Sequence, residues 1–143
     1  MLLTLSLCAG MLAGCGSSGD SGSGESDGGT ETAETASTED GENVIYFGVN
    51  YELTGSNPII GEAAIKGIDM AVSDINESGG VTVNGTTYQL AYKALDNGFN
   101  TEESALNAQE FADDESIVAM VGPNDSDMCM ATSAILTEYG LPM

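Results

Sequence analysis

Residues 44–80, VIYFGVNYELTGSNPIIGEAAIKGIDMAVSDINESGG, carry a strand signal followed by a helix signal. The first part, residues 44–49, is an unbroken apolar run rich in β-branched and aromatic side chains, which is typical of a strand buried on both faces. After a polar loop, apolar residues recur every three or four positions and predict the packed stripe of a helix: Ile60, Ala64, Ile68, Ala71, Val72 and Ile75. Gly79-Gly80 is expected to end that helix.

The same order repeats downstream. Asn84-Gly85 between β-prone residues predicts a two-residue hairpin, whose second arm continues as a longer strand through residues 88–95. Residues 101–104 read as a capped helix start with acids in the first turn. The buried face of that helix is expected to be formed by Ala105, Ala108, Phe111 and Ala112.

Another short buried strand is predicted over residues 117–121, and a last helix over residues 127–139, packed through Ala131, Ala134 and Ile135. Helices and strands that alternate in this way predict an α/β fold, a Rossmann-like parallel sheet with helices on both faces. Ligands of such sheets bind beyond the carboxyl ends of the strands. The loops expected at that edge are residues 50–60, 96–100 and 122–127.

The charge balance is strongly acidic, with 23 Asp and Glu against two Lys and Arg and a formal net charge of −21. Nucleic acid is therefore not expected as a partner, because binding phosphates needs clustered Lys and Arg. The sequence has no His, and it shows no metal-ligand cluster, phosphate loop or catalytic triad. We expect no metal, no cofactor and no enzymatic activity, so a lipid-anchored enzyme is the least favoured function. Cys129 is expected to be a small core residue.

The first fifteen residues, MLLTLSLCAGMLAGC, are apolar and too short for an ordinary transmembrane helix. Their end, residues 12–15, resembles the lipobox of bacterial lipoproteins, which implies a signal peptide over residues 1–14 and a lipidated Cys15. The alternative is an uncleaved hydrophobic anchor. No Lys or Arg precedes the apolar core, so the true start is expected upstream of Met1.

Between Cys15 and residue 44, the chain has eight acids, no base, no aromatic and no aliphatic residue larger than Ala. The segment of residues 15–43 is therefore expected to be a disordered acidic linker that begins at the lipidated Cys15. At the other end, a helix is expected to stop at Gly140 and a new strand to begin at Leu141. The chain is thus expected to be a fragment.

Residues 44–143 resemble the type I periplasmic binding proteins, and among them the leucine and branched-chain amino acid binding proteins of ABC transporters. The resemblance rests on the order and spacing of short motifs: Leu53-Thr54-Gly55, Gly61, Gly67, Asp74-Ile75-Asn76, Gly79-Gly80, Asp96, Gly122-Pro123 and Ser126. It implies two lobes that close on a ligand, with this chain forming the first part of the N-terminal lobe.

The resemblance also implies a function. The expected protein is exported, lies in the periplasm or on the outer face of the cytoplasmic membrane, and captures an amino acid or a similar small polar solute. Its expected partners are that solute, the ABC permease and ATPase subunits, and the membrane through its lipid anchor. The alternative is a ligand-sensing domain of the same superfamily coupled to a signalling partner.

Candidate binding residues follow from the same resemblance. Ser126 matches the family serine that holds the ligand α-carboxylate together with backbone N–H groups, which favour an anion at a helix N-terminus. The alternative is that Ser126 or Asp127 only caps the helix, and Asp127 is the expected cap. Asp125 is expected to face either solvent or the ammonium group of the ligand.

Two further candidates lie in the other loops. Ile60 precedes the glycine Gly61, at a position where the family often has an aromatic residue, and it either lines an apolar pocket or belongs to the helix core. Asp96 ends a predicted strand and is either a ligand contact or a plain turn aspartate.

Overall fold

The computed structural model describes residues 43–143. The predicted signal peptide, the lipidation site at Cys15 and nearly all of the acidic linker lie outside the described residues. Four strands form one sheet in the order β2-β3-β1-β4, and they comprise β1 (Val44–Tyr51), β2 (Val81–Val83), β3 (Thr86–Asp96) and β4 (Ile117–Val121). β1 is parallel to both β3 and β4, and the short β2 returns antiparallel to β3 as the predicted hairpin.

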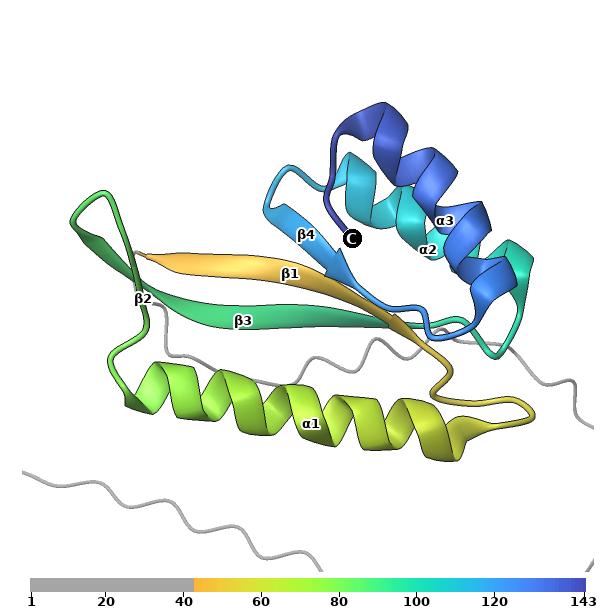
Figure 1. Ribbon diagram of the computed structural model, residues 1–143, viewed down its shortest axis with the longest axis horizontal. Coiled ribbons are helices and arrows are strands. Elements are labelled where there is room, and N and C mark those ends of the chain that lie inside the picture. Colours follow the sequence, from red (N-terminus) through yellow and green to blue (C-terminus); the bar gives the residue numbers. More distant parts are fainter. Residues whose placement is uncertain (1–42) are drawn as a thin grey trace, which may run out of the picture.

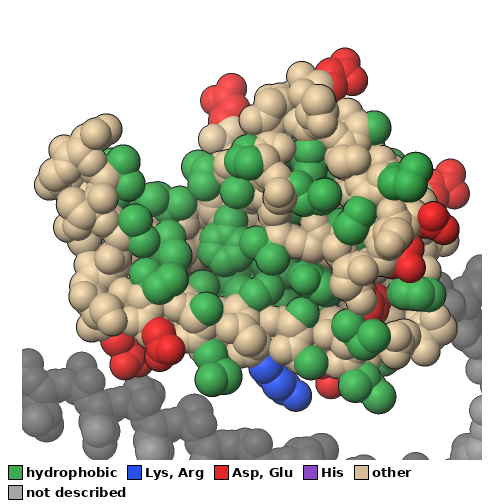
Figure 2. Space-filling model, viewed as in Figure 1, with side chains coloured by type: hydrophobic (Ala, Val, Ile, Leu, Met, Phe, Trp, Pro, Cys, Tyr) green, Lys and Arg blue, Asp and Glu red, His purple; other side chains and the backbone are tan. Residues whose placement is uncertain are grey.

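Helices cover both faces of this sheet, as the sequence predicts. α1 (Pro58–Glu77) lies along one face, whereas α2 (Thr101–Asp113) and α3 (Ser126–Tyr139) lie side by side on the other (Figure 1). In the view of Figure 2, apolar side chains gather over the sheet between these two helical layers. This is the predicted α/β fold.

The core is divided between the two faces. On the α1 side, the buried cluster consists of Val49, Val72, Tyr92 and Ala94. On the other side it consists of Leu95, Ala108, Phe111, Ile117, Met120 and Leu136. Gly48 of β1 makes the second cluster possible, because a Cβ atom at this position would lie 2.7 Å from the Phe111 ring.

The predicted packed stripe of α1 is rotated relative to the observed one. Ile60 is 44% exposed, Ile75 is 36% exposed and Ala71 is exposed, so these three do not form the core face. The side turned to the sheet carries Gly61, Ile65, Ile68 and Val72. The prediction is confirmed for Ile68 and Val72. It is wrong for Ile60, Ala71 and Ile75 because apolar residues occur on most sides of α1, and a shift of one residue turns a helix face by about 100°.

The face of α3 was also predicted wrongly. The helix begins at Ser126, one residue earlier than predicted, and it buries Met128, Thr132 and Leu136, while Ala134 is exposed. Thr132 reads as polar in the sequence, yet its hydroxyl donates to the carbonyl of Met128, which lets the side chain pack inside.

The expectations for α2 and for the C-terminal residues have different outcomes. On α2, Ala108 and Phe111 are buried as predicted. Residues 141–143 do not form a strand, although the N–H of Met120 in β4 donates to the carbonyl of Pro142 at 2.9 Å.

Candidate functional site

The carboxyl ends of β1, β3 and β4 meet at one edge of the sheet because these strands are parallel. The segments that follow them are residues 52–57, 97–100 and 122–125. The first and third of these segments contact one another directly, because the side-chain amide of Asn124 donates to Oε1 of Glu52 at 3.1 Å. The N–H of Asn97 in the second segment donates to the carbonyl of Tyr51, at the end of β1, at 3.0 Å. We refer to these three segments as the strand-end edge.

Asp96 connects two segments of the strand-end edge. Its carboxylate accepts from the N–H of Leu53 at 2.8 Å, from the N–H and the hydroxyl of Thr54, and from the N–H of Gly98 at 2.8 Å. Burial disfavours the charged form of Asp96, but these hydrogen bonds outweigh it and hold the pKa of the carboxyl below its usual value. Asp96 is therefore more than a plain turn residue, because it fastens the β1–α1 loop to the end of β3.

A buried amide network lies beneath the edge, centred on Asn50, which is fully buried. Its Nδ2 donates to the carbonyl and the hydroxyl of Ser104, at 2.9 and 3.2 Å. Its Oδ1 accepts from Asn97 at 3.2 Å and from Asn107 at 3.3 Å. The network fixes α2 against β1. Sequence analysis missed it, and the available signal was an asparagine at the end of an otherwise apolar strand.

The first turn of α3 corrects one prediction. The N-cap is Asp125 and not Asp127, because the carboxylate of Asp125 accepts from the N–H groups of Asp127 at 3.0 Å and Met128 at 3.4 Å. Helix α3 begins one residue earlier than predicted, so the capping position moves back to Asp125. Asp127 lies exposed in the first turn.

This cap changes how the turn can bind an anion. Two of the N–H groups that are free at an uncapped helix N-terminus are occupied by Asp125. Ser126 is exposed, and its hydroxyl makes no hydrogen bond within residues 43–143. Its ligand-binding role remains a prediction, and it depends on the hydroxyl more than on the helix terminus.

Glu52 is a polar residue of the strand-end edge that sequence analysis did not single out. It follows β1 directly and is fully buried. Its Oε1 accepts from the side-chain amide of Asn124 at 3.1 Å, whereas its Oε2 is buried without a hydrogen-bond partner among the described residues. The pKa of the neighbouring Tyr51 is raised, first by burial and then by the electrostatic effects of Glu52 and Cys129.

Two glycines allow the segments around Glu52 to approach closely. A Cβ atom at Gly61 of α1 would lie 1.9 Å from the carbonyl oxygen of Glu52. Gly122, which follows β4, has a φ of +88°, and a Cβ atom there would lie 2.5 Å from the carbonyl oxygen of Asn50. Both positions therefore need glycine for steric reasons.

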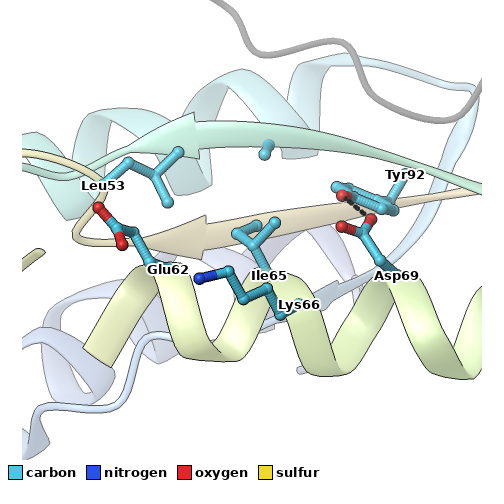
Figure 3. Close-up of a pocket in the computed structure, with 7 residues that line it drawn as sticks. Leu53, Glu62, Ile65, Lys66, Asp69 and Tyr92 are labelled. Carbon is cyan, nitrogen blue, oxygen red and sulfur yellow. Dashed lines mark hydrogen bonds between the residues drawn. The ribbon is translucent and has the colours of Figure 1, made fainter. Parts of the chain in front are cut away.

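A groove of about 270 Å³ runs between α1 and β3 (Figure 3). Its lining residues are Leu53, Glu62, Ile65, Lys66, Asp69, Tyr92 and Ala94. The Tyr92 hydroxyl donates to the Asp69 carboxylate, and Leu53 and Ile65 point into the groove beside Lys66. Of these residues, Leu53 alone belongs to the strand-end edge, and none is a predicted binding residue.

The predicted site residues thus fall into three places. Asp125, Ser126 and Asp127 share the first turn of α3, Asp96 lies against the β1–α1 loop, and Ile60 lies exposed on the first turn of α1. Within residues 43–143, no hydrogen bond joins one of these groups to another.

Residues 43–143 contain no group of three or more His, Cys, Asp or Glu side chains placed to hold a metal ion. None of the helices α1 to α3 is both long and apolar enough to cross a membrane.

Known proteins resemble this chain in fold and in sequence. A family model described as periplasmic binding protein matches residues 44–143. The branched-chain amino acid transporter substrate-binding protein LivJ from Streptococcus pneumoniae, solved with isoleucine, is 33% identical with a TM-score of 0.63. The similarity covers 70% of this chain and 28% of LivJ.

Two more solved structures agree. A putative branched-chain amino acid ABC transporter protein from Rhodospirillum rubrum is 25% identical over 69% of this chain and 28% of its own, with a TM-score of 0.61. The leucine-binding protein LivK from Thermotoga maritima is 25% identical over 69% of this chain and 26% of its own, with a TM-score of 0.54. The chain thus spans between a quarter and a third of the length of these relatives.

Proposed function

Since the chain belongs to the periplasmic binding protein family, we propose that it is the extracytoplasmic solute-binding protein of an ABC importer. Its solute is a branched-chain amino acid or a similar small polar compound. The observation that carries the proposal is the match of residues 44–143 to the family, together with 33% identity to a protein solved with isoleucine. Capture takes place between two lobes, of which this chain supplies the first part of one.

In this proposal the strand-end edge forms one wall of the binding site. The exposed hydroxyl of Ser126 donates to the α-carboxylate of the solute. Asp125 caps α3 and is thereby partly neutralised by two N–H groups, so it repels that carboxylate less than a free aspartate would. Ile60, exposed on the first turn of α1, supplies apolar surface to the solute side chain.

The mechanism requires no bond to be made or broken. The chain binds the solute, and closure of the lobes presents it to permease subunits, while ATPase subunits drive import. The lipid on Cys15 holds the protein at the membrane, and the acidic residues 15–43 act as the tether. A ligand-sensing role with a signalling partner is the second candidate, and the proposed lipid anchor on Cys15 disfavours it.

Calorimetry of the intact protein tests the solute. We expect leucine, isoleucine or valine to bind, and the Ser126→Ala variant to bind the same compound at least about tenfold more weakly, equal to about 1.4 kcal/mol. If no amino acid binds to the wild-type protein, the proposed class of solute is wrong.

Cell fractionation tests the anchor. Changing Cys15→Ser removes the proposed lipid acceptor, and the protein should move from the membrane fraction to the soluble fraction. If the variant stays in the membrane fraction, an uncleaved hydrophobic anchor explains the leader better than a lipid does.

A further inference from the structure

One carboxylate oxygen of Glu52 has no hydrogen-bond partner among the described residues, although the side chain is buried and the missing bond destabilises the fold. The side chain is fully buried, and one carboxylate oxygen is bonded to Asn124 while the other has no partner among residues 43–143. Burying a carboxylate disfavours the folded state unless donors surround it. Buried polar atoms in native proteins are nearly always paired, so the free oxygen needs an explanation.

The described residues do not supply a compensating positive charge. The chain has two basic residues, and Lys93 pairs with Glu110 at 2.8 Å. Lys66 lines the groove between α1 and β3, and no salt bridge within residues 43–143 joins it to Glu52. The pKa of Tyr51 is raised first by burial and then by the nearby Glu52.

Glu52 lies within the strand-end edge. The turn after β4 contacts its carboxylate through Asn124, and the first turn of α1 packs against its carbonyl at Gly61. Asn124 is itself exposed, so the side chain that donates to Oε1 of Glu52 lies at the surface and can change its rotamer. The carboxylate of Glu52 is therefore one hydrogen bond away from the surface of the strand-end edge.

We propose that Glu52 is a hydrogen-bond acceptor of the strand-end edge. Its second carboxylate oxygen accepts a hydrogen bond from an N–H donor that lies outside residues 43–143. The donor is either the ammonium group of the solute or an N–H group of the remaining protein. This inference rests on the proposed function. Under this inference, the buried Glu52 of this lobe binds the ammonium group of the solute or an N–H group of the remaining protein.

The Glu52→Gln variant of the intact protein tests this assignment. The amide keeps the shape of the side chain and the oxygen that accepts from Asn124, but it removes the charge and puts a donor in place of the free oxygen. Three quantities are measured: the dissociation constants of leucine and of 4-methylpentanoate, which lacks the amine, and the melting temperature without ligand.

The two sources of the donor give different results. If the solute supplies the donor, leucine binding weakens by about tenfold or more, 4-methylpentanoate binding changes by less than about twofold, and the melting temperature does not fall. If the protein supplies it, the melting temperature falls by about 4 °C or more and both compounds lose affinity alike. Unchanged affinities combined with an unchanged or raised melting temperature overturn the inference.

A second variant covers the case in which Glu52→Gln does not fold. Glu52→Met has a similar volume and no polar atom, and the exposed Asn124 amide can turn to solvent, so the variant is neutral or stabilising if no second donor reaches the carboxylate. If a second donor exists, this variant leaves it unpaired and lowers the melting temperature or the affinity for leucine. A Glu52→Met protein as stable as the wild type, with the same affinity for leucine, contradicts the inference.

Glu138→Gln is the matched control, because it makes the same change of charge at an exposed position of α3. It should leave all three quantities unchanged. A wild-type protein that binds no amino acid contradicts the proposed function and not the inference. The melting temperatures of the two Glu52 variants then decide the inference alone, and the absence of any decrease overturns it.

Discussion

The carboxyl ends of β3 and β1 lie at the same edge of the sheet, but they use their carboxylates differently. At the end of β3, Asp96 receives hydrogen bonds from Leu53, Thr54 and Gly98. At the end of β1, Glu52 receives one hydrogen bond on one oxygen and none on the other within the described residues. Asp96 thus has a structural role, because it links the β1–α1 loop to the end of β3. One carboxylate oxygen of Glu52, in contrast, can still accept a hydrogen bond. An acidic residue at a strand end does not indicate by itself which role it has.

The largest expected effect breaks the close packing around Glu52. Gly61→Ala places a methyl group 1.9 Å from the Glu52 carbonyl oxygen, so α1 or the end of β1 must shift. We expect a loss of about 2 kcal/mol or more in the free energy of unfolding, measured by urea denaturation of the intact protein.

Gly67→Ala is the matched control on the same helix. A Cβ atom there meets no atom within 4 Å, so the substitution should stabilise α1 by up to about 1 kcal/mol. Equal effects of the two substitutions would show that contact with Glu52 does not determine the position of α1.

The next largest expected effect is the loss of the hydrogen bonds that Asp96 accepts at the end of β3. Asp96→Ala leaves the N–H groups of Leu53, Thr54 and Gly98 without their acceptor, so we expect a loss of about 2 kcal/mol in the free energy of unfolding. Asp74→Ala, at an exposed position on α1, should change stability by less than about 0.5 kcal/mol. A small effect of Asp96→Ala would mean that solvent replaces Asp96 as the acceptor.

A smaller effect distinguishes the two aspartates of the α3 turn. Asp125→Ala removes the acceptor of the Asp127 and Met128 N–H groups and should cost about 1 kcal/mol of stability. Asp127→Ala should cost about 0.5 kcal/mol or less, because only a favourable charge in the first turn is lost. The reverse order of these two costs would restore Asp127 as the cap.

The smallest expected effect is a dependence on pH. Burial opposes the charge of Asp96, but its hydrogen bonds lower the pKa overall. Its contribution to stability is therefore present above the ordinary value of 3.8 and is lost as the pH falls through the lower pKa of the folded state. Denaturation of wild type and Asp96→Asn between pH 7 and about pH 2 should show a weaker acid dependence in the variant. Identical profiles would place the acid-sensitive group elsewhere.

The sequence predicted the strands and helices well where the pattern was strong. The apolar run of β1 and the Asn84-Gly85 hairpin have few alternatives, and both are present in the structure. The orientation of α1 was not predictable in the same way, because its apolar residues do not lie on one side. The deciding contact is between Gly61 and the backbone of Glu52, which a pattern of side-chain polarity does not reveal.

The polar residues in and next to the strand-end edge were harder to predict for a related reason. Asp125, Ser126 and Asp127 are all good capping residues, so composition could not decide which of them caps α3. Asn50 and Glu52 are buried through partners 54 and 72 positions later in the chain. Local sequence carries no information about such distant contacts, whereas the position of the edge follows from topology alone.

The hydrogen bonds of Asp96 also bear on the entropy of binding. They fasten the β1–α1 loop to the end of β3 before any solute arrives. The conformational entropy of ordering this loop is therefore lost during folding and is not lost again on association. This wall of the proposed site is preorganised, so under the proposed function most of the movement during solute capture should take place in the rest of the protein.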